Sequence, residues 1–241
     1  MDDDQERTLA LYKRIYRLAD DDLYRDDGRD ETETILAAVA DYRIDRPQAF
    51  EIDPDRCALV VIDMQAGFVS RRSPQWIPQA ERMVPHLDAV AETARGLGIP
   101  VVFTSAQYLD PSPNDALRMT TAIAEGNLGA GTAGLEVVPG LWRDGDVLIG
   151  TKHTYDAFWQ TDLDYILRGL RRDTIVITGT MTNFCCEATA RAGFDRGYHV
   201  VMCADLCASD NPWSHDATLQ TIRRGYGRVL DGDEVTAHWR R

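Results

Sequence analysis

The sequence has no long uncharged apolar stretch, no secretory signal and no excess of basic residues. No segment approaches the roughly 18 apolar residues that cross a bilayer, and the acidic N-terminus lacks the apolar core of a signal peptide. With 39 acidic and 26 basic residues, the formal net charge is −13, and such a surface repels nucleic-acid phosphates. We therefore expect a cytoplasmic protein that handles a small molecule, with neither a membrane nor a nucleic acid as partner.

Cysteine and histidine are few, and their spacing matches neither a set of disulfides nor a zinc site. The five cysteines stand at positions 57, 185, 186, 203 and 207. An odd number without a secretory signal argues against a set of disulfides. No CxxC pair and no HExxH motif is present, so we predict no structural zinc. The cysteines are expected to be free thiols, and one of them is a candidate for a reactive group.

Residues 51–241 read as one α/β domain, because strand-length apolar runs alternate there with segments of helical period. The runs lie at residues 58–63, 101–106, 147–152, 174–179, 199–204 and 227–231. Helical periodicity follows Pro78 and recurs within residues 163–170, 187–197 and 215–225. Strands separated by helices predict a doubly wound, mainly parallel six-stranded sheet with helices on both faces.

Residues 1–50 differ from the rest of the chain. Two stretches, residues 5–24 and 31–42, carry apolar residues at a helical period, and a charged break separates them. We predict an N-terminal helical extension that packs on the domain or on a second subunit. A solvated arm is the alternative.

Three of the predicted strand ends carry side chains with useful chemistry. Asp63 ends the first strand, Lys152 ends the third, and the fourth runs into the turn TMTNFCCE. The carboxyl ends of parallel strands share one edge of the sheet, where ligands bind in open α/β folds. A carboxylate, an ammonium group and a thiol should therefore meet there. Taken singly, each has an ordinary alternative: a turn-forming aspartate, a solvated lysine and a packing cysteine.

The turn before the predicted helix favours Cys185 as the nucleophile. Thr182 and Asn183 are good N-cap residues, and a helix N-terminus favours a thiolate. Cys185 and Cys186 lie about 100° apart on a helix, so only one of them can readily face the edge of the sheet, and the other is expected to be a small buried hydrophobe. Moving a proton from an ordinary thiol to an ordinary aspartate costs roughly 6 kcal/mol. A nearby Lys152 would lower that cost, so that Asp63 could accept the proton and later return it to a leaving amine.

These residues resemble the motifs of the isochorismatase-like cysteine hydrolase superfamily. The resemblance lies in ALVVIDMQAGF, in GDVLIGTKHTYDAFWQTDLDYILRGL and in TIVITGTMTNFCCEATARAGFDRGYHVVMCADLCAS, and it is collinear from about residue 53 to residue 235. It implies an Asp63–Lys152–Cys185 triad, with Asp63 in D-x-Q and Cys185 in T-N-x-C. It also implies a cis peptide at Thr180–Met181 and an oxyanion hole formed by the N–H groups of Met181 and Cys185.

The resemblance also bears on the reaction. It implies thiolate attack on an amide, carbamoyl or ureido carbonyl, release of ammonia or an amine, and hydrolysis of a thioester, with no cofactor. Nicotinamidases carry a metal-binding D-x-H motif, but residues 64–85 contain neither histidine nor aspartate, so a catalytic metal and nicotinamide are not expected. A vinyl-ether hydrolase of the isochorismatase type, which needs no thiol, and a non-catalytic binding or scaffold subunit are the alternatives.

Pocket residues are candidates by position only. Six side chains lie in loops that follow strand ends and are proposed to contact substrate: Phe68, Trp76, Tyr108, His153, Phe158 and Trp159. Packing under the loops is the alternative for each of them. Residues 110–134 read as a lid or an oligomer contact, and the resemblance implies a homodimer or homotetramer.

Overall fold

The computed structural model describes residues 6–7, 10, 49–109 and 127–241. Most of the predicted helical extension and most of the predicted lid therefore lie outside the described residues. The boundary at residue 50 stays a prediction, and residues Pro47–Arg241 form one compact unit. Within the described ranges, no helix combines the length and the apolar character that crossing a membrane requires.

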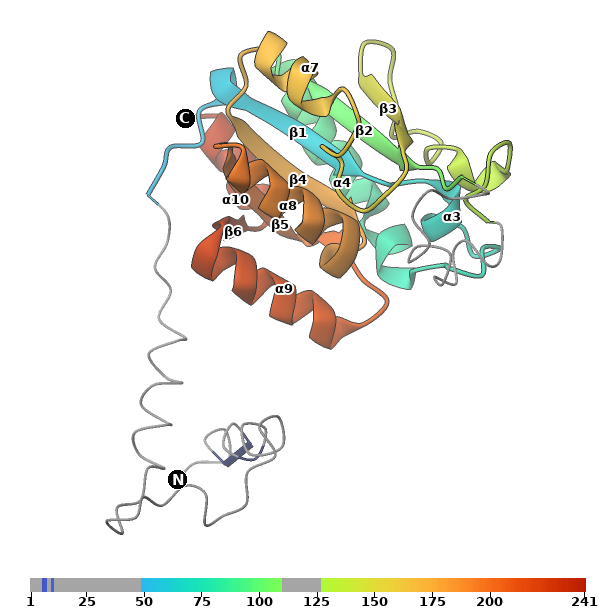
Figure 1. Ribbon diagram of the computed structural model, residues 1–241. Helices are drawn as coiled ribbons and strands as arrows, with labels where there is room; N and C mark the ends of the chain where they lie inside the picture. The colour runs from blue at the N-terminus through green and yellow to red at the C-terminus, as the bar shows by residue number, and fades with distance from the viewer. Residues whose placement is uncertain (1–5, 8–9, 11–48, 110–126) are drawn as a thin grey trace. The chain divides into compact units, whose positions relative to one another are not determined.

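The core of this unit is a six-stranded sheet in which every neighbouring pair is parallel (Figure 1). The strands are β1 (Cys57–Ile62), β2 (Val101–Ala106), β3 (Val147–Lys152), β4 (Thr174–Thr180), β5 (His199–Ala208) and β6 (Gly227–Leu230), in the spatial order β3-β2-β1-β4-β5-β6. The predicted class is confirmed. The chain winds outward from β1 to β3 and then outward from β4 to β6, so β1 and β4 flank the switch point of the topology.

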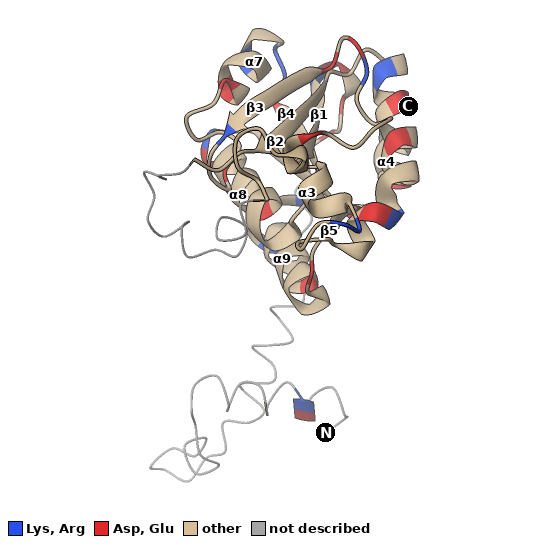
Figure 2. Ribbon diagram, turned by 90° about the vertical axis from the view of Figure 1, so that its right-hand side faces the viewer, with Lys and Arg blue, Asp and Glu red and all other residues tan. Residues whose placement is uncertain are grey.

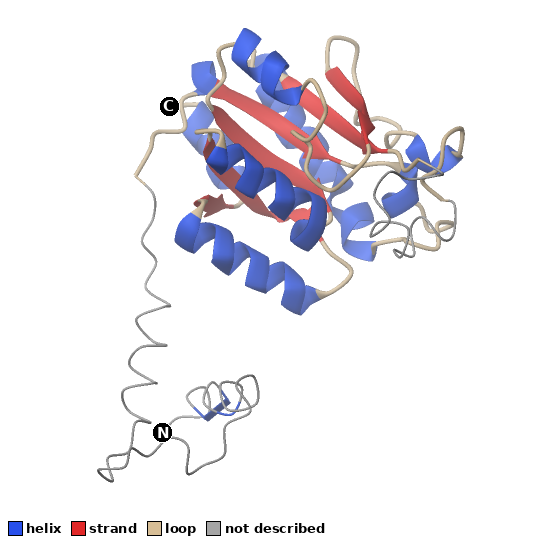
Figure 3. Ribbon diagram, in the orientation of Figure 1, coloured by secondary structure: helices blue, strands red, loops and turns tan. Residues whose placement is uncertain are grey.

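Helices cover both faces of the sheet (Figure 3). The described helices are α3 (Ala66–Val69), α4 (Pro78–Gly96), α7 (Leu163–Gly169), α8 (Glu187–Asp195), α9 (Pro212–Gly225) and α10 (Gly232–Trp239), with short turns η2 (Pro54–Arg56), η3 (Ala133–Leu135) and η4 (Thr182–Cys186). Two of these helices, α3 and α10, are not among the predicted ones. Helix α10 begins with an Asp231–Glu234 capping box, a local signal that was available.

Strand β1 shows how the two layers are built. All six of its residues are buried, and their side chains alternate between the faces. Leu59 and Val61 belong to the core under α4 and α10, whereas Val60 and Ile62 belong to the core under α7, α8 and α9. A strand that is covered on both sides must be apolar throughout, which is why the charged residues lie mainly on the surrounding helices and loops (Figure 2).

Candidate active site

Asp63 directly follows β1 and is held by backbone and side-chain hydrogen bonds. Its φ of 47° places it in the left-handed region, which aspartate tolerates better than most residues. The Thr104 hydroxyl on β2 donates to Asp63 Oδ1 at 2.6 Å and accepts from the Asp63 amide at 3.1 Å. The Thr180 hydroxyl on β4 donates to the Asp63 carbonyl at 2.9 Å. The carboxylate is therefore fixed from the two strands that flank β1.

Lys152 links the carboxylate to the thiol. It is the last residue of β3, and its Nζ lies 2.6 Å from Asp63 Oδ2 and 3.4 Å from Cys185 Sγ. Asp63 and Lys152 are fully buried, and Cys185 is 2% exposed. The structure therefore brings together the three side chains that the sequence places at strand ends.

Cys185 lies in η4, a short π-helical turn between β4 and α8. The peptide bond between Thr180 and Met181 is cis, as the resemblance implies. The amides of Phe184 and Cys186 both donate to the Met181 carbonyl at 3.1 Å. Cys186 is turned away from Lys152, and its thiol contacts the Thr178 carbonyl at 3.9 Å. The geometry thus distinguishes the two adjacent cysteines: Cys185 faces the charged pair, and Cys186 packs against the sheet.

Burial dominates the protonation of the thiol. Desolvation raises the pKa of Cys185 to about 12, although the Lys152 cation acts to lower it. Burial tends to lower the pKa of Lys152, but the charges of Asp63 and Cys185 outweigh burial and raise it, so the ammonium group stays charged. The expectation that the helix start favours a free thiolate is therefore not met, because burial outweighs that effect and favours the protonated thiol.

The phenols of two tyrosines, Tyr108 and Tyr155, interact electrostatically with Cys185. Tyr108 is buried, and the charges of Cys185 and Asp63 contribute, after burial, to the raised pKa of its phenol. Burial and the charge of Cys185 likewise raise the pKa of Tyr155, whose ring lies 5.3 Å from that of Phe184. Both phenols therefore stay protonated and can donate hydrogen bonds. Tyr155 and Phe184 are not among the residues predicted to contact substrate, although they are close in sequence to Lys152 and Cys185.

The other predicted pocket residues have packing or hydrogen-bond partners of their own. Phe158 packs against Tyr198 in a tilted arrangement, with ring centroids 5.4 Å apart, and lies against Gly193 of α8. Phe68 is part of the core on the α4 face, and Trp76 donates to Glu81. Trp159 is 44% exposed. His153 Nδ1 lies 2.7 Å from the Gln107 carbonyl, at the ends of β3 and β2.

The predicted capping roles of Thr182 and Asn183 are wrong. Thr182 and Asn183 lie inside η4, and neither side chain caps α8, which begins only at Glu187. Their side chains reach other elements instead: Thr182 Oγ1 lies 2.9 Å from His215 Nδ1, and Asn183 Oδ1 accepts from the Ser209 hydroxyl at 2.7 Å. Such contacts between residues 26 to 33 positions apart are invisible to a reading of local sequence.

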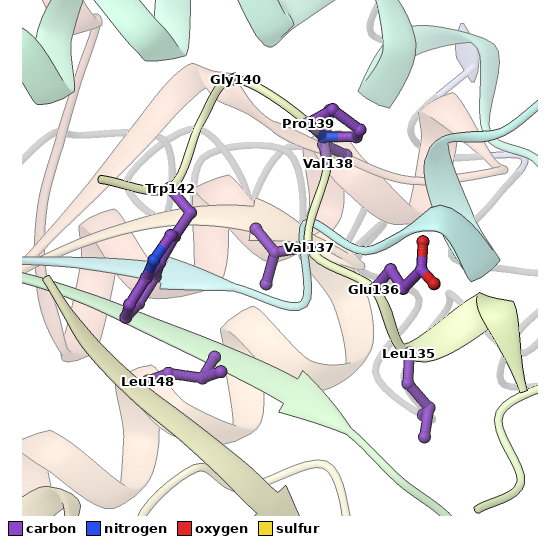
Figure 4. Close-up of a pocket in the computed structure, with 8 residues that line it drawn as sticks. All are labelled: Leu135, Glu136, Val137, Val138, Pro139, Gly140, Trp142 and Leu148. Carbon is purple, nitrogen blue, oxygen red and sulfur yellow. The ribbon is translucent and has the colours of Figure 1, made fainter. Parts of the chain in front are cut away.

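Metal clusters and surface hollows are the other kinds of site that a small molecule or ion could use. Among the described residues, no group of three or more His, Cys, Asp or Glu side chains is placed to hold a metal ion. A shallow, mostly apolar hollow of about 440 Å³ lies beside β3 (Figure 4). Its lining comprises Leu135, Glu136, Val137, Val138, Pro139, Gly140, Trp142 and Leu148. None of the three candidate catalytic side chains lines this hollow.

Several known proteins are similar to this chain over most of its length. A Bacillus subtilis isochorismatase family protein, YwoC, is 35% identical over 186 residues, covering 76% of this chain and 94% of that protein. The ureidoacrylate amidohydrolase RutB of Methylobacterium radiotolerans is 31% identical, with 77% and 80% covered. The crystal structure of a cysteine hydrolase from Pseudomonas syringae pv. phaseolicola superposes with a TM-score of 0.72 at 28% identity, covering 79% of this chain and 95% of that one. Residues 57–234 match the isochorismatase domain, and the chain therefore belongs to the isochorismatase family of hydrolases.

Proposed function

We propose that this hydrolase is a cysteine-dependent amidohydrolase that cleaves a C–N bond in a small amide, carbamoyl or ureido compound. The observation that carries the proposal is the position of Lys152 Nζ, within hydrogen-bond distance of both Asp63 Oδ2 and Cys185 Sγ, with all three side chains buried. The printed name of the relative RutB, a ureidoacrylate amidohydrolase, supports the substrate class.

The chemistry begins with a proton transfer inside the site. Asp63 accepts the proton of Cys185, and the charges change from carboxylate and thiol to carboxylic acid and thiolate while Lys152 stays positive. The net charge of the site is unchanged, so the transfer avoids the cost of burying an additional charge. The loss of a proton to solvent, in contrast, would leave one uncompensated negative charge, which is what the raised pKa of Cys185 reflects.

The thiolate then attacks the substrate carbonyl carbon. The carbonyl π electrons move to oxygen, and we propose that the N–H groups of Met181 and Cys185 stabilise this oxyanion. The N–H groups of a helical turn point toward its N-terminal end, which in η4 is the end beside the Thr180–Met181 peptide. Collapse of the intermediate breaks the C–N bond, and the leaving nitrogen takes the proton from Asp63.

Hydrolysis of the thioester restores the enzyme. Asp63, now a carboxylate again, accepts a proton from water, and the hydroxide attacks the acyl carbon. The C–S bond breaks, the sulfur regains its proton, and the acid product leaves. Every proton in this cycle moves between Asp63, Cys185, the substrate and water, and the scheme requires no cofactor. Tyr108 and Tyr155 supply hydrogen-bond donors beside the reacting centre.

The test is ammonia release by the purified full-length protein from a panel of primary amides, N-carbamoyl compounds and ureido acids. Cys185→Ala is expected to lower turnover by at least about a thousandfold. Cys186→Ala is the matched control, because its sulfur packs against Thr178, and this variant should retain turnover. Equal turnover by wild type and Cys185→Ala would refute the nucleophile. Retention of vinyl-ether cleavage by Cys185→Ala, with loss in Asp63→Asn, would indicate the isochorismatase reaction instead.

A further inference from the structure

The turn that carries Cys185 is tied to the segment after β5 by two side-chain contacts. Thr182 Oγ1 lies 2.9 Å from His215 Nδ1, and the Ser209 hydroxyl donates to Asn183 Oδ1 at 2.7 Å. Thr182 follows Met181 directly and lies three residues before Cys185. The contact with His215 is therefore made between the two backbone amides that the proposed reaction uses for the oxyanion.

The helix that carries His215 is anchored by hydrogen bonds at its start and along its length. It lies in the first turn of α9, whose N-cap Asn211 accepts from the amides of Trp213 and Ser214 at 2.9 and 3.2 Å. Further along this helix, the Thr218 hydroxyl donates to Glu187 of α8 at 2.7 Å. An imidazole on a helix that is anchored in this way can fix the position of the Thr182 hydroxyl.

The imidazole is in the right state to do so. Burial lowers the pKa of His215, against a weaker opposing effect of Asp216, so the ring is neutral near pH 7. A neutral imidazole has one donor and one acceptor nitrogen, and the Thr182 hydroxyl can complement either. Thr182 is fully buried, so a hydroxyl left without a partner would carry a desolvation cost, which favours keeping this contact.

We propose that His215 is a positioning residue, which through Thr182 holds the N–H groups of Met181 and Cys185 in the direction of the substrate oxygen. This inference rests on the proposed amidohydrolase function. Its structural basis is the hydrogen bond to the turn, and no transfer of a proton by His215 is invoked. The role predicts a specific defect: a loss of His215 should weaken reactions that build negative charge on oxygen and spare those that do not.

Two reactions of the same sulfur separate these effects. Iodoacetamide forms an S–C bond at a saturated carbon as iodide leaves, so no charge develops on a substrate oxygen. Isobutyraldehyde forms an S–C bond while the carbonyl electron pair moves to oxygen, which then takes the thiol proton. The first reaction reports on the thiol and its charged neighbours. The second also reports on the oxyanion hole.

The experiment measures both reactions in the full-length protein. The alkylation rate of Cys185 is followed by mass spectrometry, and the aldehyde affinity is obtained from protection against alkylation. In His215→Ala we expect an alkylation rate within about twofold of wild type, an aldehyde affinity lower by about 10- to 100-fold, and amide turnover lower by a similar factor with little change in KM. His215→Asn, whose amide can still contact Thr182, should recover most of both losses.

The controls make each outcome decisive. His199→Ala removes a histidine at the amino end of β5, the opposite edge of the sheet, and should change neither reaction. Thr182→Val should reproduce the defect of His215→Ala. If wild type binds aldehyde and hydrolyses amides but His215→Ala does both equally well, the positioning role is overturned and the proposed function stands. An equal loss of both sulfur reactions, without recovery in His215→Asn, would show mere structural support. If wild type neither binds aldehyde nor hydrolyses any amide, the proposed function fails together with this inference.

Discussion

The protonation of the buried triad makes a prediction about the pH dependence of Cys185. Because burial raises the pKa of this thiol to about 12, loss of its proton to solvent leaves only a very small thiolate fraction at pH 7, and this fraction grows tenfold per pH unit. Proton transfer to Asp63 produces a thiolate without any exchange with solvent. The proposed chemistry therefore predicts that wild-type Cys185 is alkylated by iodoacetamide at a nearly constant rate between pH 6.5 and pH 8.5.

The distances indicate what Lys152 contributes to that rate. At an effective dielectric constant of 20, a cation 3.4 Å from the Cys185 sulfur attracts a thiolate by about 5 kcal/mol. The same cation attracts the Asp63 carboxylate, 2.6 Å away, by about 6 kcal/mol. Because the two attractions are similar, Lys152 stabilises one negative charge on either partner, with a small preference for Asp63. That preference agrees with a resting thiol.

The perturbation is Lys152→Met. Without the cation, Asp63 becomes an unpaired buried carboxylate, which is expected to hold a proton near neutral pH. A thiolate then requires proton loss to solvent and has no counterion. We expect the alkylation rate at pH 7 to fall about a thousandfold, because the thiolate loses an attraction of about 5 kcal/mol. The remaining rate should rise tenfold per pH unit.

The assay is the alkylation of Cys185, followed by mass spectrometry from pH 6.5 to pH 8.5. N-acetylcysteine in the same buffers is the control, since an ordinary thiol shows the tenfold slope below its pKa. A tenfold slope in the wild type would refute internal proton transfer. A flat profile at the wild-type rate in Lys152→Met would refute the role given to the lysine.

Two further predictions concern stability, measured as the free energy of unfolding in urea at fixed protein concentration. Asp63→Asn and Lys152→Met should each cost about 3–5 kcal/mol, because each leaves one buried partner uncompensated, and the double variant should cost about 2–4 kcal/mol less than their sum; additive costs would contradict the buried pair. Gly179→Ala should cost at least about 3 kcal/mol, because φ is 110° and a Cβ would lie 2.0 Å from the Ile62 carbonyl oxygen. Gly150→Ala on β3 is the matched control, since a Cβ there meets nothing within 4 Å, and a similar cost for both would contradict the packing at Gly179.

The sequence is sufficient to predict the sheet, because apolar runs of strand length alternate with segments of helical period. Strands β2 and β3 begin and end at the predicted residues. Strand β5 extends to Ala208, four residues beyond the prediction, since Asp205 interrupts the apolar run. Its carboxylate accepts from the Gly232 amide at 2.8 Å, a contact that the local pattern does not reveal.

The candidate site, too, is only partly predictable from the sequence. Asp63, Lys152 and Cys185 could be placed together because the carboxyl ends of parallel strands share an edge. The supporting groups could not, because their roles depend on long-range contacts. Thr104 binds Asp63 from 41 positions away, and His215 reaches Thr182 across 33 positions. Which aromatic side chains face the thiol is likewise decided by loop conformation.

The pairing of β1 with β4 has a consequence for how this family can change. Ile62 lies opposite Gly179, the last but one residue of β4. The acid Asp63 and the nucleophile Cys185 therefore follow two adjacent, hydrogen-bonded strands. A shift of β1 by one residue relative to β4 would move Asp63 by about 3.3 Å and reverse the face of the sheet to which it points. Insertions between the strands leave this alignment untouched. New specificities can therefore arise through the connecting segments, while the reactive atoms keep their spacing.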